Sequence, residues 1–145
     1  MKYKRVNNIY QLVEPHVFPS KIKGYNADTI WYKIEPDGTI TGKTLYGWDG
    51  ASGPTIDDPD ISVAERDKRR SRTAVPSLRH DIKYQMMRDG VIPLSCKSIA
   101  DDEFHDDLDE RGFDRRRTDI WHLGVKYGGA SSCIPGTKQE ILEAP

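Results

Sequence analysis

Residues 77–84 read Ser-Leu-Arg-His-Asp-Ile-Lys-Tyr and belong to a segment whose apolar side chains recur at helical spacing. On a helical wheel of about 100° per residue, four apolar side chains share one arc, whereas His80 and Tyr84 fall roughly opposite. The four are Val75, Leu78, Ile82 and Met86. A helix that carries buried side chains on two sides is usually packed between two layers. The sequence therefore predicts that His80 faces the interior or a pocket.

Three helices are predicted downstream of residue 72. The first begins near Thr73 as N-cap, holds Pro76 in its first turn, where proline is tolerated, and ends by Gly90. The second spans about 95–111 and ends at a glycine. Its expected buried stripe is Ala100, Phe104 and Leu108. The third spans about 115–127 and ends at a Gly-Gly pair.

Residues 1–50 carry the pattern of β-strands. Residues 29–34 are rich in β-branched and aromatic side chains, 35–38 read Glu-Pro-Asp-Gly, and 39–46 alternate polar and apolar side chains. This pattern predicts a β-hairpin closed by a Pro-Asp-Gly turn. Further short strands are expected within 10–13 and 16–22.

We therefore expect one α+β domain over the 145 residues. Its β part, a hairpin or small antiparallel sheet, occupies 1–50, and the helical part occupies 73–128, with two helices packed antiparallel. A Gly-rich loop at 47–59 joins them, followed by a short helix or loop at 60–72, and a tail follows at 131–145.

The charge balance argues against nucleic acid as the partner. Charged residues make up 31% of the chain, but the formal net charge is only −1. The charges are nevertheless clustered, with basic runs at 66–72 and 115–117 and an acidic block at 101–110. Each cluster is either a solvated face or a local docking surface for an anionic partner or a lipid headgroup.

The sequence shows no sign of export or membrane insertion. It lacks a run of about 18 apolar residues, and its N-terminus lacks the apolar segment of a signal peptide. Cys96 and Cys133 have no zinc-type Cys-x-x-Cys spacing, and we expect them to be reduced, although they could form one bridge.

The strongest candidate site combines His80 with carboxylates. A histidine acting as a base needs a carboxylate to orient it. Asp81 diverges from His80 by about 100° on the helix and cannot do this. Asp101 can, if the second helix packs antiparallel on the first, and Tyr84 can donate a hydrogen bond to the same carboxylate. Asp81 is then available to bind a cation, whereas the structural alternative is a buried histidine satisfied by a neighbouring acid.

The Gly-rich loop is the second candidate. Gly47, Gly50 and Gly53 allow backbone carbonyls to turn inward, as oxygen-ligated calcium sites require, and Asp49 adds a carboxylate. The alternative is an ordinary turn.

The order of these motifs resembles two groups of proteins. His80-Asp81-x-x-Tyr84, with a glycine-rich loop before it and Asp101 after it, resembles the phospholipase A2 arrangement. Residues 28–130 more closely resemble small phage and prophage proteins of unknown function. Their pattern is Gly-x-x-Asp-Gly-Ala-Ser, His-Asp-x-x-Tyr, Ala-Asp-x-x-Phe and a last aromatic helix that ends in glycines. This chain matches that pattern at residues 47–52, 80–84, 100–104 and 121–129.

The phospholipase resemblance implies a calcium-dependent hydrolase. His80 would activate a water, Asp101 would steady His80 with support from Tyr84, and Asp81 would bind Ca²⁺ together with Asp49 and the carbonyls of the loop glycines 47 and 50. The cysteines that flank His-Asp in secreted phospholipases are absent here, where Arg79 and Ile82-Lys83 stand.

Three functions remain open. The favoured expectation is a phage-encoded hydrolase of lipid esters, with membrane phospholipid as partner. The alternative is a non-catalytic component of a virion, associated with tail or capsid proteins, so that the expected location is a virion or the host cytoplasm. Metal phosphohydrolases also carry a His-Asp pair, but they need a further upstream histidine on a helical fold, and His16 lies in a β-like region.

Overall fold

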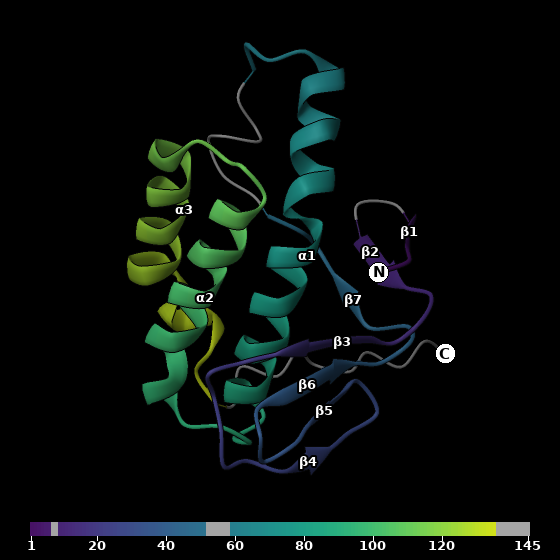
Figure 1. Ribbon diagram of the computed structural model, residues 1–145, viewed down its shortest axis with the longest axis vertical. Coiled ribbons are helices and arrows are strands. Elements are labelled where there is room, and N and C mark those ends of the chain that lie inside the picture. Colours follow the sequence, from purple (N-terminus) through teal and green to yellow (C-terminus); the bar gives the residue numbers. More distant parts are fainter. Residues whose placement is uncertain (7–8, 52–58, 136–145) are drawn as a thin grey trace, which may run out of the picture.

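Strands precede helices along the chain in the computed structural model, which describes residues 1–6, 9–51 and 59–135 (Figure 1). The strands are β1 (Tyr3–Val6), β2 (Ile9–Leu12), β3 (His16–Pro19), β4 (Ala27–Asp28), β5 (Tyr32–Ile34), β6 (Thr39–Gly42) and β7 (Gly47–Trp48). The helices are α1 (Val63–Arg88), α2 (Lys97–Glu110) and α3 (Arg115–Gly128), with 3-10 turns η1 (Leu94–Cys96) and η2 (Gly129–Ser132). The predicted α+β class is confirmed.

The strands form two small antiparallel sheets. Their orders are β1-β2-β7 and β3-β6-β5-β4. The hairpin β5–β6 is the one that the Pro-Asp-Gly turn predicted. Gly38 adopts a φ of +93°, and the Asp37 carboxylate accepts the backbone N–H of Thr39 at 2.8 Å. A positive φ favours glycine and the short Asp side chain closes the turn, so the sequence alone was enough to place this hairpin.

The prediction that the first helix begins near Thr73 is wrong. Its N-cap is Ser62, whose side chain accepts the backbone N–H of Glu65 at 3.2 Å, and Glu65 pairs with Arg69 one turn later at 2.9 Å. The cap and this i,i+4 ion pair favour a helix in a segment with few apolar residues. Pro76 consequently lies in the helix interior, where it removes one backbone hydrogen bond, and not in the first turn.

The second helix packs antiparallel to the first, as predicted. Arg79 contacts Asp107 at 2.6 Å, whereas Lys83, one turn further along α1, pairs with Glu103, one turn earlier in α2. This reversed order is that of antiparallel neighbours. Figure 1 shows α3 beside α2 and running in the opposite direction to it.

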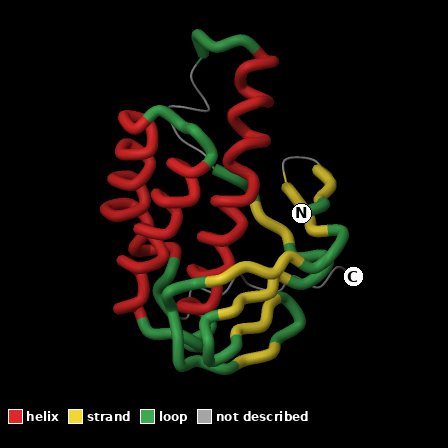
Figure 2. The backbone as a smooth tube through the Cα atoms, viewed as in Figure 1, coloured by secondary structure: helices red, strands yellow, loops and turns green. Residues whose placement is uncertain are grey.

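The first helix is the middle layer of the fold (Figure 2). Its Ile82 contacts the four-stranded sheet so closely that a Cβ added at Gly42 in β6 would come within 2.7 Å of it. His80 and Tyr84 point away from that contact, towards α2 and α3. Ile82 is 0% exposed and His80 is 6% exposed, which confirms that both sides of the helix are buried.

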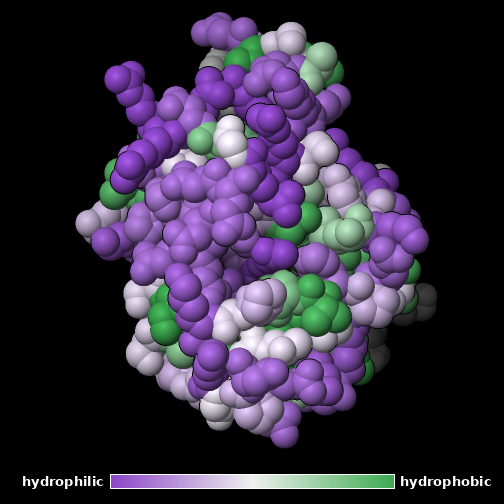
Figure 3. Space-filling model, viewed as in Figure 1, coloured by the Kyte–Doolittle hydropathy of each residue, from purple (hydrophilic) through white to green (hydrophobic). Residues whose placement is uncertain are grey.

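The face of the molecule in Figure 3 is mainly hydrophilic, with hydrophobic residues in small patches. None of the helices in the described part of the chain is long and apolar enough to cross a membrane. Cys96 and Cys133 are buried, and both are free thiols in this structure.

Candidate functional site

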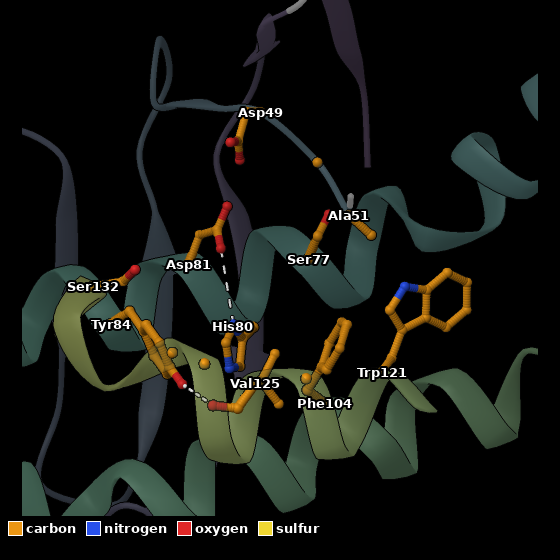
Figure 4. Close-up of a pocket in the computed structure, with 14 residues that line it drawn as sticks. Asp49, Ala51, Ser77, His80, Asp81, Tyr84, Phe104, Trp121, Val125 and Ser132 are labelled. Atoms are coloured by element: carbon orange, nitrogen blue, oxygen red, sulfur yellow. Dashed lines mark hydrogen bonds and ion pairs between the residues drawn. The ribbon is translucent and has the colours of Figure 1, made fainter. Parts of the chain in front are cut away.

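A cavity of about 430 Å³ lies between α1, α3 and the segment that follows β7 (Figure 4). This volume falls within the range of about 300–1,000 Å³ that is usual for small-molecule sites. The wall residues are Asp49, Gly50 and Ala51 after β7; Ser77, His80, Asp81 and Tyr84 in α1; Phe104 in α2; Trp121, Gly124, Val125 and Gly128 in α3; and Gly129 and Ser132 in η2. His80 therefore faces a pocket, as its place on the helix predicted.

On its inner side, His80 bonds to Asp101. The distance from His80 Nε2 to Asp101 Oδ1 is 3.0 Å, and the Tyr84 hydroxyl donates to the same oxygen at 2.8 Å. The rings of His80 and Tyr84 lie 4.1 Å apart between centroids, and Asp101 is only 2% exposed. The contacts that helix spacing predicted are thus present.

Lys97 completes the surroundings of Asp101, and the sequence interpretation missed it. Its Nζ lies 2.6 Å from Asp101 Oδ2 and also donates to the carbonyl of Val125 in α3 at 2.8 Å. Burial by itself raises the pKa of Asp101, but hydrogen bonds from His80, Lys97 and Tyr84 outweigh burial and hold that pKa below its usual value. The available signal was the i,i+4 spacing of Lys97 and Asp101.

Asp81 lies on the other side of the His80 ring. Its Oδ1 is 3.9 Å from His80 Nδ1, which is within ion-pair range but too long for a hydrogen bond. The hydrogen bond that orients the ring comes from Asp101, as predicted. Burial raises the pKa of the Asp81 carboxyl, and the charge of Asp49 adds to the rise, whereas His80 opposes it. In Figure 4, the carboxylates of Asp49 and Asp81 point towards each other.

This carboxylate pair is the part of the cavity with the chemistry to hold a cation. Burial and, to a smaller extent, the charge of Asp49 raise the pKa of Asp81; a bound cation would favour the ionised form of both carboxyls, and carboxylate oxygens are ligands that Ca²⁺ prefers. Gly50 lines the same cavity, whereas Gly47 pairs with β2 and does not line it; Gly53 lies outside the described residues. Among the described residues, no group of three His, Cys, Asp or Glu side chains is arranged around a metal position. A cation here would therefore take most of its ligands from backbone carbonyls and water.

The other half of the cavity is apolar. Phe104, predicted as part of the buried stripe of the second helix, is 4% exposed and lies 4.9 Å from the His80 ring between centroids. Trp121 and Val125 continue this wall along α3. The cavity thus places a histidine and two carboxylates beside an aromatic surface, an arrangement that can bind a molecule with one polar and one apolar end.

His16 does not join this site. It lies in β3, where its Nε2 accepts a hydrogen bond from Arg79 Nε at 3.5 Å, and it is not part of the cavity wall. The upstream histidine that a metal phosphohydrolase would need is therefore not brought to the His80–Asp81 pair.

Comparisons with known proteins found no match, so function is inferred from the geometry of the site. No protein-family model, no curated protein and no solved structure matches this chain.

Proposed function

We propose that this protein is a carboxylic ester hydrolase of phospholipase A2-like type, with His80 as its general base. The observation that supports the proposal is the two-sided environment of His80. Its Nε2 is bonded to a buried carboxylate, whereas its Nδ1 faces the cavity with Asp81 3.9 Å away. A histidine that serves only the core has no need of an open cavity beside its second nitrogen.

The two ring nitrogens would have different tasks. Asp101 keeps a hydrogen on Nε2, which leaves Nδ1 as a proton acceptor towards the cavity. A water at Nδ1 gives its proton to His80 while its oxygen attacks the ester carbonyl carbon. The bond to the leaving alcohol then breaks, and the alcohol takes the proton from His80. Asp101 stabilises the imidazolium formed in between, and Tyr84 and Lys97 keep Asp101 ionised and in position.

Asp81 and Asp49 would hold a divalent cation, for which Ca²⁺ suits their oxygen ligands best. When bound, the ion supplies a positive charge that stabilises the developing negative charge on the carbonyl oxygen. Without the cation, these two carboxylates would repel that charge. Binding the cation would therefore be the role of Asp81, which does not orient His80.

The test of the proposal is ester hydrolysis by the wild type and by a His80→Gln variant. We expect the substitution to lower the rate by about 10²-fold or more, because a general base contributes at least that much. The matched control is His122→Gln on α3, where the ring contacts Asp102 outside the cavity. The control should keep the wild-type rate.

A structural role for His80 predicts a different result. His80→Gln would then lower the free energy of unfolding by about 1–3 kcal/mol, because its buried partner loses a hydrogen bond. Urea unfolding of the same proteins measures this. A large loss of stability together with no hydrolysis of any ester by the wild type would overturn the enzyme proposal and favour a virion component.

The cation is tested separately by calorimetry with Ca²⁺. We expect the wild type to bind with a Kd of about 10⁻³ M or lower, as weak extracellular calcium sites do. Asp81→Asn should weaken binding by at least tenfold. Asp106→Asn, which removes an exposed carboxylate paired with Lys21, should leave it unchanged. Equal binding by the wild type and Asp81→Asn would place the ion elsewhere.

A further inference from the structure

Two of the α3 positions that line the cavity are glycines and carry no side chain. Gly124 and Gly128 are one helical turn apart, and both line the cavity. A Cβ built at either position would meet nothing within 4 Å, so open space lies above the helix there. Glycine costs a helix about 1 kcal/mol relative to alanine. The two glycines widen the cavity at the expense of helix propensity.

This open space adjoins both the apolar wall and His80. Trp121 and Val125 flank the glycines on α3, and Phe104 lies across from them. His80 is only 6% exposed, and on the cavity side the nearest polar group to its Nδ1 that the described residues supply is the Asp81 carboxylate, 3.9 Å away. A complementary ligand would place a polar group at Nδ1 of His80 and an apolar group against the neighbouring apolar wall.

We propose that the apolar group of the ester lies along the backbone of α3 at Gly124 and Gly128, and that these two glycines set its maximum length. This inference rests on the proposed function for the identity of the polar group. At roughly 30 Å³ per water-sized group, the 430 Å³ cavity has room for on the order of fifteen non-hydrogen atoms. Because the polar half of the cavity takes part of this volume, the apolar compartment suits one acyl chain of moderate length and not both chains of a diacyl lipid.

The test uses binding, which does not depend on hydrolysis. Calorimetry with neutral n-alkanols from butanol to dodecanol measures the affinity of the wild type, Gly124→Leu and Gly128→Leu. Affinity for the wild type should rise roughly fourfold with each added methylene, from the burial of that group, and then level off when the compartment is full. Both leucine variants should level off several methylenes earlier and bind decanol at least tenfold more weakly.

The matched control is Arg116→Leu, which adds the same side chain to α3 at an exposed position outside the cavity. It should bind every alkanol as the wild type does. A wild type that binds no alkanol, or leucine variants with the wild-type length limit, would overturn the inference.

Ester hydrolysis separates this inference from the proposed function. The predicted pattern of alkanol binding without any hydrolysis would support the apolar compartment and count against the enzyme. Hydrolysis of a graded series of p-nitrophenyl esters, with the same length preference in the wild type and in Gly124→Leu, would support the enzyme and overturn the inference.

Discussion

At the scale of single residues, Gly129 protects the geometry of the site by having no side chain. Its φ is −81°, which any residue adopts, so the backbone does not require glycine here. A Cβ at this position would instead collide with the Tyr84 hydroxyl and come within 3.0 Å of the ring. Since that hydroxyl bonds to Asp101, the glycine leaves room for the group that holds the carboxylate.

We predict that Gly129→Ala lowers the free energy of unfolding by about 1–3 kcal/mol through overpacking. The matched control is Gly128→Ala, which meets open space and should be neutral or stabilising by up to about 1 kcal/mol. Urea unfolding of both variants and of the Tyr84→Phe/Gly129→Ala double variant measures the effect. The double variant should recover part of the loss, because the hydroxyl is the nearest colliding atom. Equal stability of the two alanine variants would show that Tyr84 moves aside freely.

Helical spacing was enough to predict some residues of the site, whereas others have roles that depend on tertiary contacts. His80, Tyr84 and Asp101 were found because helical spacing fixes the direction of a side chain once the helix is known. Gly129 was missed because its role depends on tertiary packing, which brings the segment after α3 against Tyr84. Lys97 was missed although its i,i+4 spacing to Asp101 is a local signal, and only its second bond, to the carbonyl of Val125 in α3, depends on tertiary packing.

At the scale of elements, the start of α1 shows where periodicity fails. Apolar side chains become sparse before Thr73, and Pro76 is usually placed in a first turn, so the pattern indicated a start near these residues. The helix nevertheless extends to Val63, because a serine cap and the Glu65–Arg69 ion pair favour it without an apolar stripe. The starts and ends of α2 and α3 were predicted more closely, since glycines mark their ends.

A buried ion pair joins α1, α2 and the segment just after β3. Lys83 in α1 is 2% exposed and pairs with Glu103 in α2. Glu103 also accepts hydrogen bonds from the Ser20 hydroxyl at 2.9 Å and from the backbone N–H of Lys21 at 2.5 Å, just after β3. Burial lowers the pKa of Lys83, while Glu103 opposes that shift. The pair thus fixes the sheet against the two helices that carry the site.

We predict that Lys83→Met lowers the free energy of unfolding by about 3–5 kcal/mol, because it leaves the Glu103 charge buried without a cation. Lys83→Met/Glu103→Gln should recover much of this loss, since glutamine is neutral and still accepts from Ser20 and Lys21. The control is Lys2→Met, which breaks an exposed pair with Glu14 and should cost less than about 1 kcal/mol. Denaturant unfolding distinguishes these outcomes, and a Lys83→Met loss no larger than that of Lys2→Met would contradict the argument.

At the scale of the whole molecule, the cavity exists only because distant parts of the chain meet. Its wall combines the segment after β7, the middle of α1, one side chain of α2 and the C-terminal half of α3. The sequence predicted the elements and the α1–α2 contact, since spacing on two helices defines their facing sides. It did not predict that α3 closes the cavity, because no local pattern specifies how a third helix is placed on two others.

The attachment of the sheet to α1 also predicts how stability depends on pH. Burial, reinforced by the positive charges of Arg79, the N-terminal amino group and Arg111, lowers the pKa of His16 to about 4. Arg79 Nε donates to the neutral ring at 3.5 Å. In the unfolded chain this histidine has its ordinary pKa of about 6.5. Between these two values the unfolded state binds the additional proton. The free energy of unfolding should therefore fall as the pH drops from about 6.5 to about 4.

Urea unfolding at several pH values between 7 and 4 measures this dependence in the wild type and in His16→Gln, which carries no titrating ring. The partly buried Asp107 has a raised pKa and acts in the opposite direction, so the difference between the two proteins, and not either curve alone, isolates His16. We expect the wild type to lose more stability than His16→Gln over this range, whereas a His105→Gln control should retain the contribution of His16. Parallel curves for the wild type and His16→Gln would mean that the ring is protonated as readily in the folded protein as in the unfolded chain. The contact of β3 with Arg79 would then not depend on a neutral histidine.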